Sequence, residues 1–240
     1  MATTNPIIYG IHPPSIRQAL ELYLQPSQVT ELRALNCKVQ GEYRTGTYSG
    51  YFDAEHIDEL IYACQQIEFA SGVYFVPNPV NPDLLARRLY KAEIVGNKEP
   101  LTSDKDIISR RWLLIDCDPI RPAGISASDA EKHHAREMIV DIDHELWSRG
   151  FPPGIIADSG NGWHLSIPIN LPVDDGGTVE KLLKRLAKQF DNEHCKVDVS
   201  VFNPARIWKL PGTMSCKGSN AKEIGRPWRM AKIVTICEGV

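Results

Sequence analysis

The order of strand and helix patterns between residues 111 and 210 is the feature that most restricts the fold of this chain. Apolar runs that end in turn residues predict strands, and stripes of apolar residues at helical spacing predict helices. The strands are expected at 111–118, 154–159, 163–169, 196–201 and 206–210, and the helices at 128–147 and 179–190. The order β-α-β-β-α-β is that of the split βαβ arrangement, an antiparallel sheet with two helices on one face.

The segment that precedes this unit predicts a second, smaller set of elements. Residues 55–67 carry apolar side chains at helical spacing, and "GVYFV" at 72–76 reads as a strand. Pro82 suits the first turn of a helix that runs through "DLLARRLY". We therefore expect an α+β protein in which an N-terminal α/β module, residues 1–110, packs with a split βαβ module resembling RNA-recognition folds, residues 111–240, in one core.

Length and composition suit a soluble globular protein. The chain has 240 residues, of which 42% are hydrophobic and 24% charged, enough for one substantial core or two small ones. No apolar run is long enough to cross a membrane, and "MATTNPIIYG" at the start lacks the blocks of a signal peptide. We expect a cytoplasmic protein with reduced cysteines, whose scattered positions match no strong zinc pattern.

Charge is distributed unevenly along the chain. The net charge is −3, yet residues 181–232 hold 12 Lys and Arg against 4 Asp and Glu, a local charge of +8. A uniformly basic nucleic-acid binder is therefore excluded. The asymmetry favours an anionic ligand for the C-terminal part, although a merely solvated basic face would look the same.

Two aspartates follow a buried-looking strand in "RWLLIDCDP". Asp116 and Asp118 are two residues apart, so in a strand both face the same side, with backbone positions about 6–7 Å apart. Carboxylates placed in this way can share hard cations such as Mg²⁺ or Mn²⁺. Cys117 between them is expected to point to the opposite face. A strand that simply ends in polar residues would show the same pattern.

A glycine hairpin and a basic segment add further candidate residues. "DSGNGWHL" offers a hydroxyl at Ser159, an imidazole at His164 and, at Gly160 and Gly162, backbone N–H groups expected to be accessible to a phosphate. A plain glycine turn with a half-buried histidine is the alternative.

Downstream, "KVDVSVFNPARIWKLPGT" supplies a third acid, Asp198, within a short strand. Arg206 and Lys209 are three apart, so both reach one site only if a bulge or turn intervenes. In "RPWR", Arg226 and Arg229 flank an aromatic residue and suit phosphate contact or base stacking.

Three motifs in this order and spacing, "LLIDCD", "SGNGWHL" and "VDVSVFNPARIWKLPGT", resemble the archaeo-eukaryotic primase superfamily. Within it, the chain is most similar to the primase-polymerase domains of plasmids, phages and mobile elements. The resemblance covers roughly residues 40 to 233. One departure is Trp228 in "RPWR", where the family pattern leads us to expect a histidine, so the role of this segment is open.

The resemblance implies roles for individual residues. Asp116, Asp118 and Asp198 would be the catalytic metal carboxylates, with two Mg²⁺ or Mn²⁺ ions. The hairpin would hold the phosphates of an NTP or dNTP through Ser159, Gly160, Asn161, Gly162 and His164. Arg206 and Lys209 would contact the triphosphate or the template. The resemblance assigns no role to Arg226 and Arg229, which we expect to contact nucleic acid from their residue types alone.

The implied activity is template-directed nucleotidyl transfer, as a DNA primase, a DNA polymerase or both, on single-stranded or primed DNA. A helicase domain or protein is a possible partner, since family members are often fused to one. Three other functions are alternatives. A nuclease or cyclase would use the same metals, and a non-polymerising nucleic-acid-binding module would expose aromatic residues rather than acids on its sheet. A rolling-circle initiator needs paired metal-binding histidines near a tyrosine, and His133 and His134 are expected on an exposed helix face instead.

Overall fold

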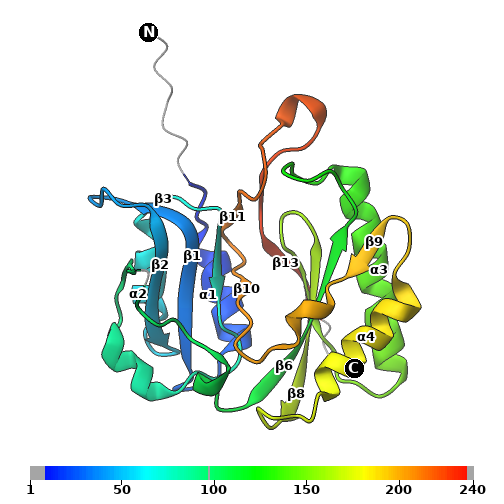
Figure 1. The fold of residues 1–240 in the computed structure, drawn as a ribbon, viewed down its shortest axis with the longest axis horizontal. Coiled ribbons are helices and arrows are strands. Elements are labelled where there is room, and N and C mark those ends of the chain that lie inside the picture. Colours follow the sequence, from blue (N-terminus) through cyan, green and yellow to red (C-terminus); the bar gives the residue numbers. More distant parts are fainter. Residues whose placement is uncertain (1–8, 97, 237–240) are drawn as a thin grey trace.

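The computed structural model describes residues 9–96 and 98–236 and contains two antiparallel sheets that lie side by side (Figure 1). The first sheet has six strands in the order β10-β4-β1-β2-β5, with β3 paired to β1. Its strands are β1 (Val29–Val39), β2 (Gly46–Asp53), β3 (Ile67–Phe69), β4 (Gly72–Phe75), β5 (Ala92–Ile94) and β10 (Trp208–Lys209).

The second sheet has five strands in the order β13-β7-β8-β6-β9, and every pair is antiparallel. Its strands are β6 (Arg110–Pro119), β7 (Ile155–Asp158), β8 (Trp163–Leu171), β9 (Cys195–Val197) and β13 (Lys232–Ile236). A separate two-stranded ribbon joins β11 (Met214–Ser215) to β12 (Arg229–Met230). The expectation of an antiparallel α+β protein is therefore confirmed.

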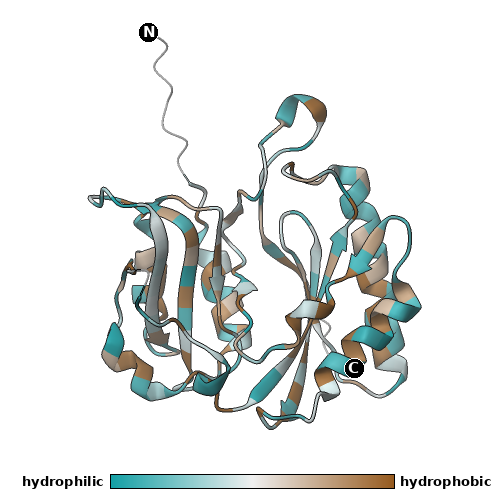
Figure 2. Ribbon diagram, viewed as in Figure 1, coloured by the Kyte–Doolittle hydropathy of each residue, from teal (hydrophilic) through white to brown (hydrophobic). Residues whose placement is uncertain are grey.

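Two amphipathic helices, α3 (Asp129–Ser148) and α4 (Thr178–Phe190), cover the outer face of the second sheet (Figure 1). Ser128 caps α3 in a capping box with Glu131, as expected for a Ser three residues before a Glu. In Figure 2 both helices alternate between hydrophobic and hydrophilic residues along their turns. The apolar stripes are buried, and they include Ala135, Met138, Ile139, Ile142, Leu146, Val179, Leu183 and Leu186.

A helix that the sequence patterns above did not include, α1 (Pro13–Tyr23), ties the two sheets together. The Tyr23 hydroxyl donates to Ser166 of β8 at 2.7 Å, and the Tyr23 ring meets Phe75 of β4 edge-on at 5.2 Å. The Trp112 indole N–H of β6 donates to the Tyr23 carbonyl at 3.1 Å. Helix α1 therefore contacts both sheets and fixes the position of one sheet relative to the other.

The remaining helical segments are short. Helix α2 (Ile57–Gln65) buries its apolar face on the first sheet, within the expected range 55–67. The helix expected from Pro82 onward is instead a 3₁₀ helix, η1, that ends at Arg87. Further 3₁₀ turns are η2 (Asp104–Asp106), η3 (Val199–Phe202) and η4 (Lys222–Ile224).

For two of the expected strands, the expected length or the expected sheet was wrong. The strand expected at 196–201 ends at Val197, because the Asp198 side chain accepts the Ser200 N–H and starts η3. The strand expected at 206–210 is reduced to β10, which pairs with β4 of the first sheet. Residues beyond 110 therefore contribute to both sheets, and the expected module boundary falls at the first residues of β6.

None of the helices within 9–96 and 98–236 is both long and apolar enough to span a bilayer.

Candidate active site

Strands β6 and β8 place three polar side chains on the inner face of the second sheet. Asp116 lies directly opposite His164 in the antiparallel register, so their side chains are neighbours on one face. Asp118 follows Asp116 by two residues and shares that face. Cys117 is fully buried on the opposite side, and burial raises the pKa of its thiol, which suits the packing role expected for it.

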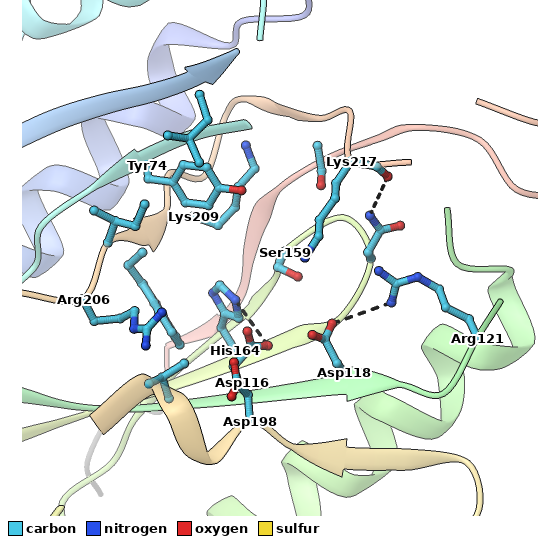
Figure 3. A pocket seen from close by; sticks show the side chains of 16 residues that line it. Tyr74, Asp116, Asp118, Arg121, Ser159, His164, Asp198, Arg206, Lys209 and Lys217 are labelled. Atoms are coloured by element: carbon cyan, nitrogen blue, oxygen red, sulfur yellow. Dashed lines mark hydrogen bonds and ion pairs between the residues drawn. The ribbon is translucent and has the colours of Figure 1, made fainter. Parts of the chain in front are cut away.

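A pocket of about 230 Å³ opens between the two sheets and collects most of the predicted site residues (Figure 3). The second sheet and its loops supply Asp116, Asp118, Ser159, Asn161, His164 and Asp198. The first sheet and the segment that leads into it supply Leu35, Tyr74, Arg206, Trp208 and Lys209. The pocket thus has acidic groups on one wall and basic groups around them.

Asp116 has an unsatisfied oxygen inside this pocket. Its Oδ1 is buried and accepts no hydrogen bond from the part of the chain that the structure describes. His164 Nε2 lies 3.5 Å away, and the His164 ring stacks on Trp208 with centroids 3.7 Å apart. A buried carboxylate oxygen without a donor is costly, so this position favours a ligand that brings positive charge.

Asp118 is in an environment that disfavours its charged form. Burial and the neighbouring Asp116 charge raise the pKa of the Asp118 carboxyl, although Arg121 and Lys217 act in the opposite direction. The Arg121 guanidinium lies 3.7 Å from Asp118 Oδ1, as the dashed line in Figure 3 marks. Two carboxylates that repel each other in this way are typical of sites that bind a cation.

The third predicted acid lies in the same pocket but is held differently. Asp198 follows β9, and its backbone N–H donates to the Asp116 carbonyl at 2.8 Å, which fixes the two residues side by side. Its side-chain Oδ1 accepts the Ser200 N–H at 2.8 Å as the cap of η3. Asp198 is therefore close to the other two acids without forming one tight cluster with them.

The carboxylates fit a divalent cation in part. Asp116 with its unsatisfied oxygen and Asp118 with its raised pKa are suitable hard oxygen donors. Across residues 9–96 and 98–236, however, no three His, Cys, Asp or Glu side chains are gathered closely enough to hold one ion. The set of three aspartate ligands stays a prediction, and the two on β6 are the donors that this conformation presents.

The hairpin between β7 and β8 is arranged differently from the expectation. The Gly160 N–H donates to Asp158 Oδ1 at 2.7 Å, and the Gly162 N–H donates to the Ser159 hydroxyl at 3.0 Å. The expectation that these two N–H groups are accessible to a phosphate is therefore wrong. A side chain on Gly162 would meet the Cys117 carbonyl at 2.6 Å, so this glycine permits the close approach of the hairpin to β6.

Asn161 contributes mainly to the position of the hairpin. Its side-chain Oδ1 accepts the Ala127 N–H at 2.9 Å, and its amide donates to the Lys217 carbonyl at 3.4 Å. The Ser159 hydroxyl and His164 remain the hairpin groups that line the pocket with side-chain atoms suited to a phosphate.

Arg206 and Lys209 line the same pocket because Arg206 lies before the strand, so the alternation of a strand does not apply to it. The Arg206 N–H donates to the Asn203 carbonyl at 3.1 Å, and β10 begins only at Trp208. One Arg206 terminal nitrogen donates to the Ser200 carbonyl, while its Nε–H is buried and finds no acceptor among the described residues. Arg206 therefore lines the pocket and also carries a buried donor that has no acceptor within the described part of the chain.

Lys209 is more constrained than the sequence indicated. Its ammonium donates to the Thr213 hydroxyl at 2.6 Å and to the Met214 carbonyl at 2.8 Å, and burial lowers its pKa to about 7. Its contacts are with the chain itself, so a role in fixing β10 suits this geometry better than a direct phosphate contact.

Arg226 and Arg229, predicted to contact nucleic acid, bind the start of α3. Arg226 forms a two-pronged ion pair with Glu131 at 2.6 and 2.8 Å, and Arg229 pairs with Asp129 at 2.7 Å. Both arginines are half-buried and pair with carboxylates of the chain itself, an arrangement that suits a structural function. Their predicted contact with nucleic acid stays untested.

Three pocket residues had no motif that identified them in the sequence. Tyr74 on β4 lies above the carboxylates, and burial together with Asp116 and Asp118 raises the pKa of its phenol. Arg121 and Lys217 come from two loops and lie near Asp118. Arg121, three residues after Asp118 in "DCDPIR", could have been proposed from its spacing; the other two depend on long-range packing.

The raised pKa of Asp118 has a measurable consequence for stability. Its charged form is disfavoured in the folded protein, so at neutral pH the group lowers stability, and this cost fades as pH falls through the folded-state pKa. We expect Asp118→Asn to raise the Tm at pH 7, with a smaller gain near pH 4. Because 46% of the side chain is exposed, screening limits the gain to less than about 1 kcal/mol.

Thermal melts at both pH values check this expectation, with Asp141→Asn on the exposed face of α3 as the matched control. At one fixed Mg²⁺ concentration the wild type should gain more stability than Asp118→Asn, because the variant lacks one of the two carboxylates that would bind the ion. A Tm that falls at pH 7 would contradict the electrostatic account of Asp118.

Comparison with known proteins found similar solved structures but no sequence match. No protein-family model and no curated protein sequence matches the chain. The polymerase domain from Mycobacterium tuberculosis Ligase D in complex with DNA is similar over 91% of this chain and 83% of that chain, with 15% identity and a TM-score of 0.46. At a TM-score below 0.5 the likeness does not establish function, which has to be inferred from the residues of the pocket.

Proposed function

We propose that the chain is a nucleotidyltransferase that joins nucleotides to a DNA strand under the direction of a template. The observation that carries this proposal is a pair of unsatisfied buried groups of opposite polarity in one pocket, Asp116 Oδ1 and the Arg206 Nε–H. A metal–triphosphate complex would satisfy both, because its cation meets carboxylate oxygens and its phosphates meet guanidinium donors.

Different residues of the pocket would bind different parts of the substrate. Arg206, the Ser159 hydroxyl and His164 would bind the phosphates of the incoming nucleotide, with Asp116 and Asp118 facing its α-phosphate. In the transfer, a bond forms from a 3′-oxygen to the α-phosphorus, and the bond to the β-phosphate oxygen breaks. Pyrophosphate leaves with the electron pair, and the hydroxyl proton passes to solvent.

Positioning and charge neutralisation would supply most of the rate enhancement, because this chemistry needs no covalent nucleophile from the protein. Mg²⁺ or Mn²⁺, when bound by Asp116 and Asp118, would act as a Lewis acid that lowers the pKa of the 3′-hydroxyl and neutralises the leaving group. The rigid ladder of β6 with β8 limits how far the two carboxylates can move, and Asp198 beside Asp116 is the proposed third acid.

The strand order supports the finer fold proposal. In β9-β6-β8-β7, each of the two strand-helix-strand units has one strand inserted between its own two strands, as in a split βαβ unit. Together with the three motifs, this favours assignment to the archaeo-eukaryotic primase superfamily. We propose that residues 1–240 act as one primase-polymerase unit, since β10 and α1 link the segments before and after residue 110.

The rival functions predict other features. A nucleic-acid-binding module without catalysis would be expected to carry aromatic rings where this sheet carries Asp116 and Asp118. A nuclease would use the same carboxylates but would not need the basic wall for a triphosphate. Single-stranded or primed DNA is therefore the proposed partner, with a helicase as a possible further one and the cytoplasm as the proposed location.

The experiment that tests the proposal is a gel assay on unprimed and primed single-stranded DNA, with dNTPs or rNTPs and with Mg²⁺ or Mn²⁺. Strands that lengthen only with a complementary nucleotide and a divalent cation would support template-directed transfer. Products on unprimed DNA would assign priming. Strands that shorten, or DNA binding with no product in any arm, would refute it.

A further inference from the structure

A second pocket, of about 450 Å³, adjoins the candidate active site at Asp118. It is formed by residues 118–125, which follow β6, and by Lys217 and Gly218. Asp118, Arg121 and Lys217 line both pockets, whereas Asp116 and Asp198 line the first. The two spaces therefore meet at one carboxylate and two cationic side chains.

The walls of this second pocket combine apolar and basic surface. Ile120 is 46% exposed, an unusual position for an isoleucine at the rim of a site, and Pro119, Pro122 and Ile125 extend the apolar surface. Arg121 and Lys217 add positive charge where the two pockets join. Apolar surface for a base or sugar next to cations for a phosphate is the combination that a nucleotide unit of a DNA strand requires.

The loop that forms the pocket is tied down rather than free. The Arg121 Nε–H donates to the Ile125 carbonyl at 3.2 Å, and the Ser219 N–H donates to the Gly124 carbonyl at 2.8 Å. Ile125 and Ser219 also form a parallel bridge between the two loops. The pocket is thus preformed, so binding there would not have to order the loop first.

We propose that this second pocket holds the 3′-terminal nucleotide of the acceptor strand, an inference that rests on the proposed function. The attacking oxygen and the leaving pyrophosphate must lie on opposite sides of the α-phosphorus. In Figure 3, Arg206 lies on one side of Asp116 and Asp118, and Arg121 lies on the other. If the triphosphate extends toward Arg206, the acceptor hydroxyl arrives from the Arg121 side, where the second pocket begins.

The test compares binding of a primer end with binding of a nucleotide. Ile120→Glu places a negative charge on the exposed apolar wall, and Ile224→Glu, at the exposed isoleucine that ends η4, is the matched control. The probe is a labelled primer–template with a recessed 3′ end, compared by fluorescence anisotropy with a blunt duplex of equal length. Binding of dATP with Mg²⁺ is measured by calorimetry.

We expect Ile120→Glu to weaken binding of the recessed end by about 10-fold or more, while dATP affinity stays within about two-fold of the wild type. Lys217→Ala, at an exposed side chain, should also weaken recessed-end binding. It should make the dependence of this binding on salt concentration shallower, because it removes one phosphate contact. Melting curves of each variant exclude misfolding as the cause.

Two results would overturn the inference. One is an unchanged preference of both Ile120→Glu and Lys217→Ala for the recessed end, and the other is an equal loss of dATP binding in Ile120→Glu. Failure of the proposed function looks different, because the wild type itself would then neither bind dATP with Mg²⁺ nor extend the primer.

Discussion

Asp116→Asn is expected to reduce nucleotide incorporation by at least about 1,000-fold, with the protein still folded. The substitution keeps the size of the side chain but removes the charge of the oxygen that lies buried without a donor. An amide there cannot neutralise a divalent cation, and the loss would fall on the transition state, where charge builds up on the transferred phosphate. Steady-state primer extension with Mg²⁺ and with Mn²⁺ measures it.

The control for this variant is Asp141→Asn, which removes one negative charge from the exposed surface of α3 and should leave incorporation unchanged. Circular dichroism and melting curves establish that Asp116→Asn is folded. Incorporation by Asp116→Asn within ten-fold of the wild type would remove Asp116 from the catalytic assignment.

Arg206→Ala is expected to weaken binding of the incoming nucleotide by about 10- to 100-fold, the range for loss of a charge-assisted hydrogen bond to a phosphate. The Nε–H of Arg206 is buried without an acceptor, so a phosphate oxygen would be its partner. Binding of a blunt DNA duplex should change little. Arg206→Lys should recover only part of the affinity, because a lysine lacks the planar fork of donors.

Calorimetric titration of wild type and variants with dATP and Mg²⁺ checks this expectation. Arg185→Ala, on the exposed face of α4, controls for the loss of one positive charge. Equal losses of nucleotide and duplex affinity in Arg206→Ala would indicate a general electrostatic effect and would exclude a specific phosphate contact.

Local patterns predicted the parts of the fold that depend on neighbouring residues. The period of two in β6 placed Asp116 and Asp118 on one face, and the short glycine turn predicted the hairpin that brings His164 opposite Asp116. The helical stripe located α3 to within one residue at each end. In each case the structure is determined by residues that lie close together in the sequence.

The rest depends on contacts between segments far apart in the chain. Nothing within "RIWKL" indicates that Trp208 and Lys209 pair with β4 of the other sheet. The expectation of free N–H groups at Gly160 and Gly162 was wrong, because these groups donate hydrogen bonds to the Asp158 carboxylate and the Ser159 hydroxyl. The orientation of these two side chains could not be predicted from the sequence.

The pocket itself could not be predicted for the same reason. It lies between the two sheets, and Tyr74 and Lys217 enter it from segments that carry no motif. Helix α1, which holds the sheets together through Tyr23, is not predicted by any of the sequence patterns above. The motifs therefore identified residues of both walls, and the tertiary structure brought the two walls together.

The most direct test of the central idea is a Mn²⁺ titration followed by electron paramagnetic resonance, in the presence and absence of dATP. If Asp116 and Asp118 together hold a divalent ion beside the phosphates of a nucleotide, the wild type binds Mn²⁺ tightly with dATP, and Asp116→Asn and Asp118→Asn each lose at least about 10-fold in affinity. Equal Mn²⁺ affinity in the wild type and both variants would contradict it.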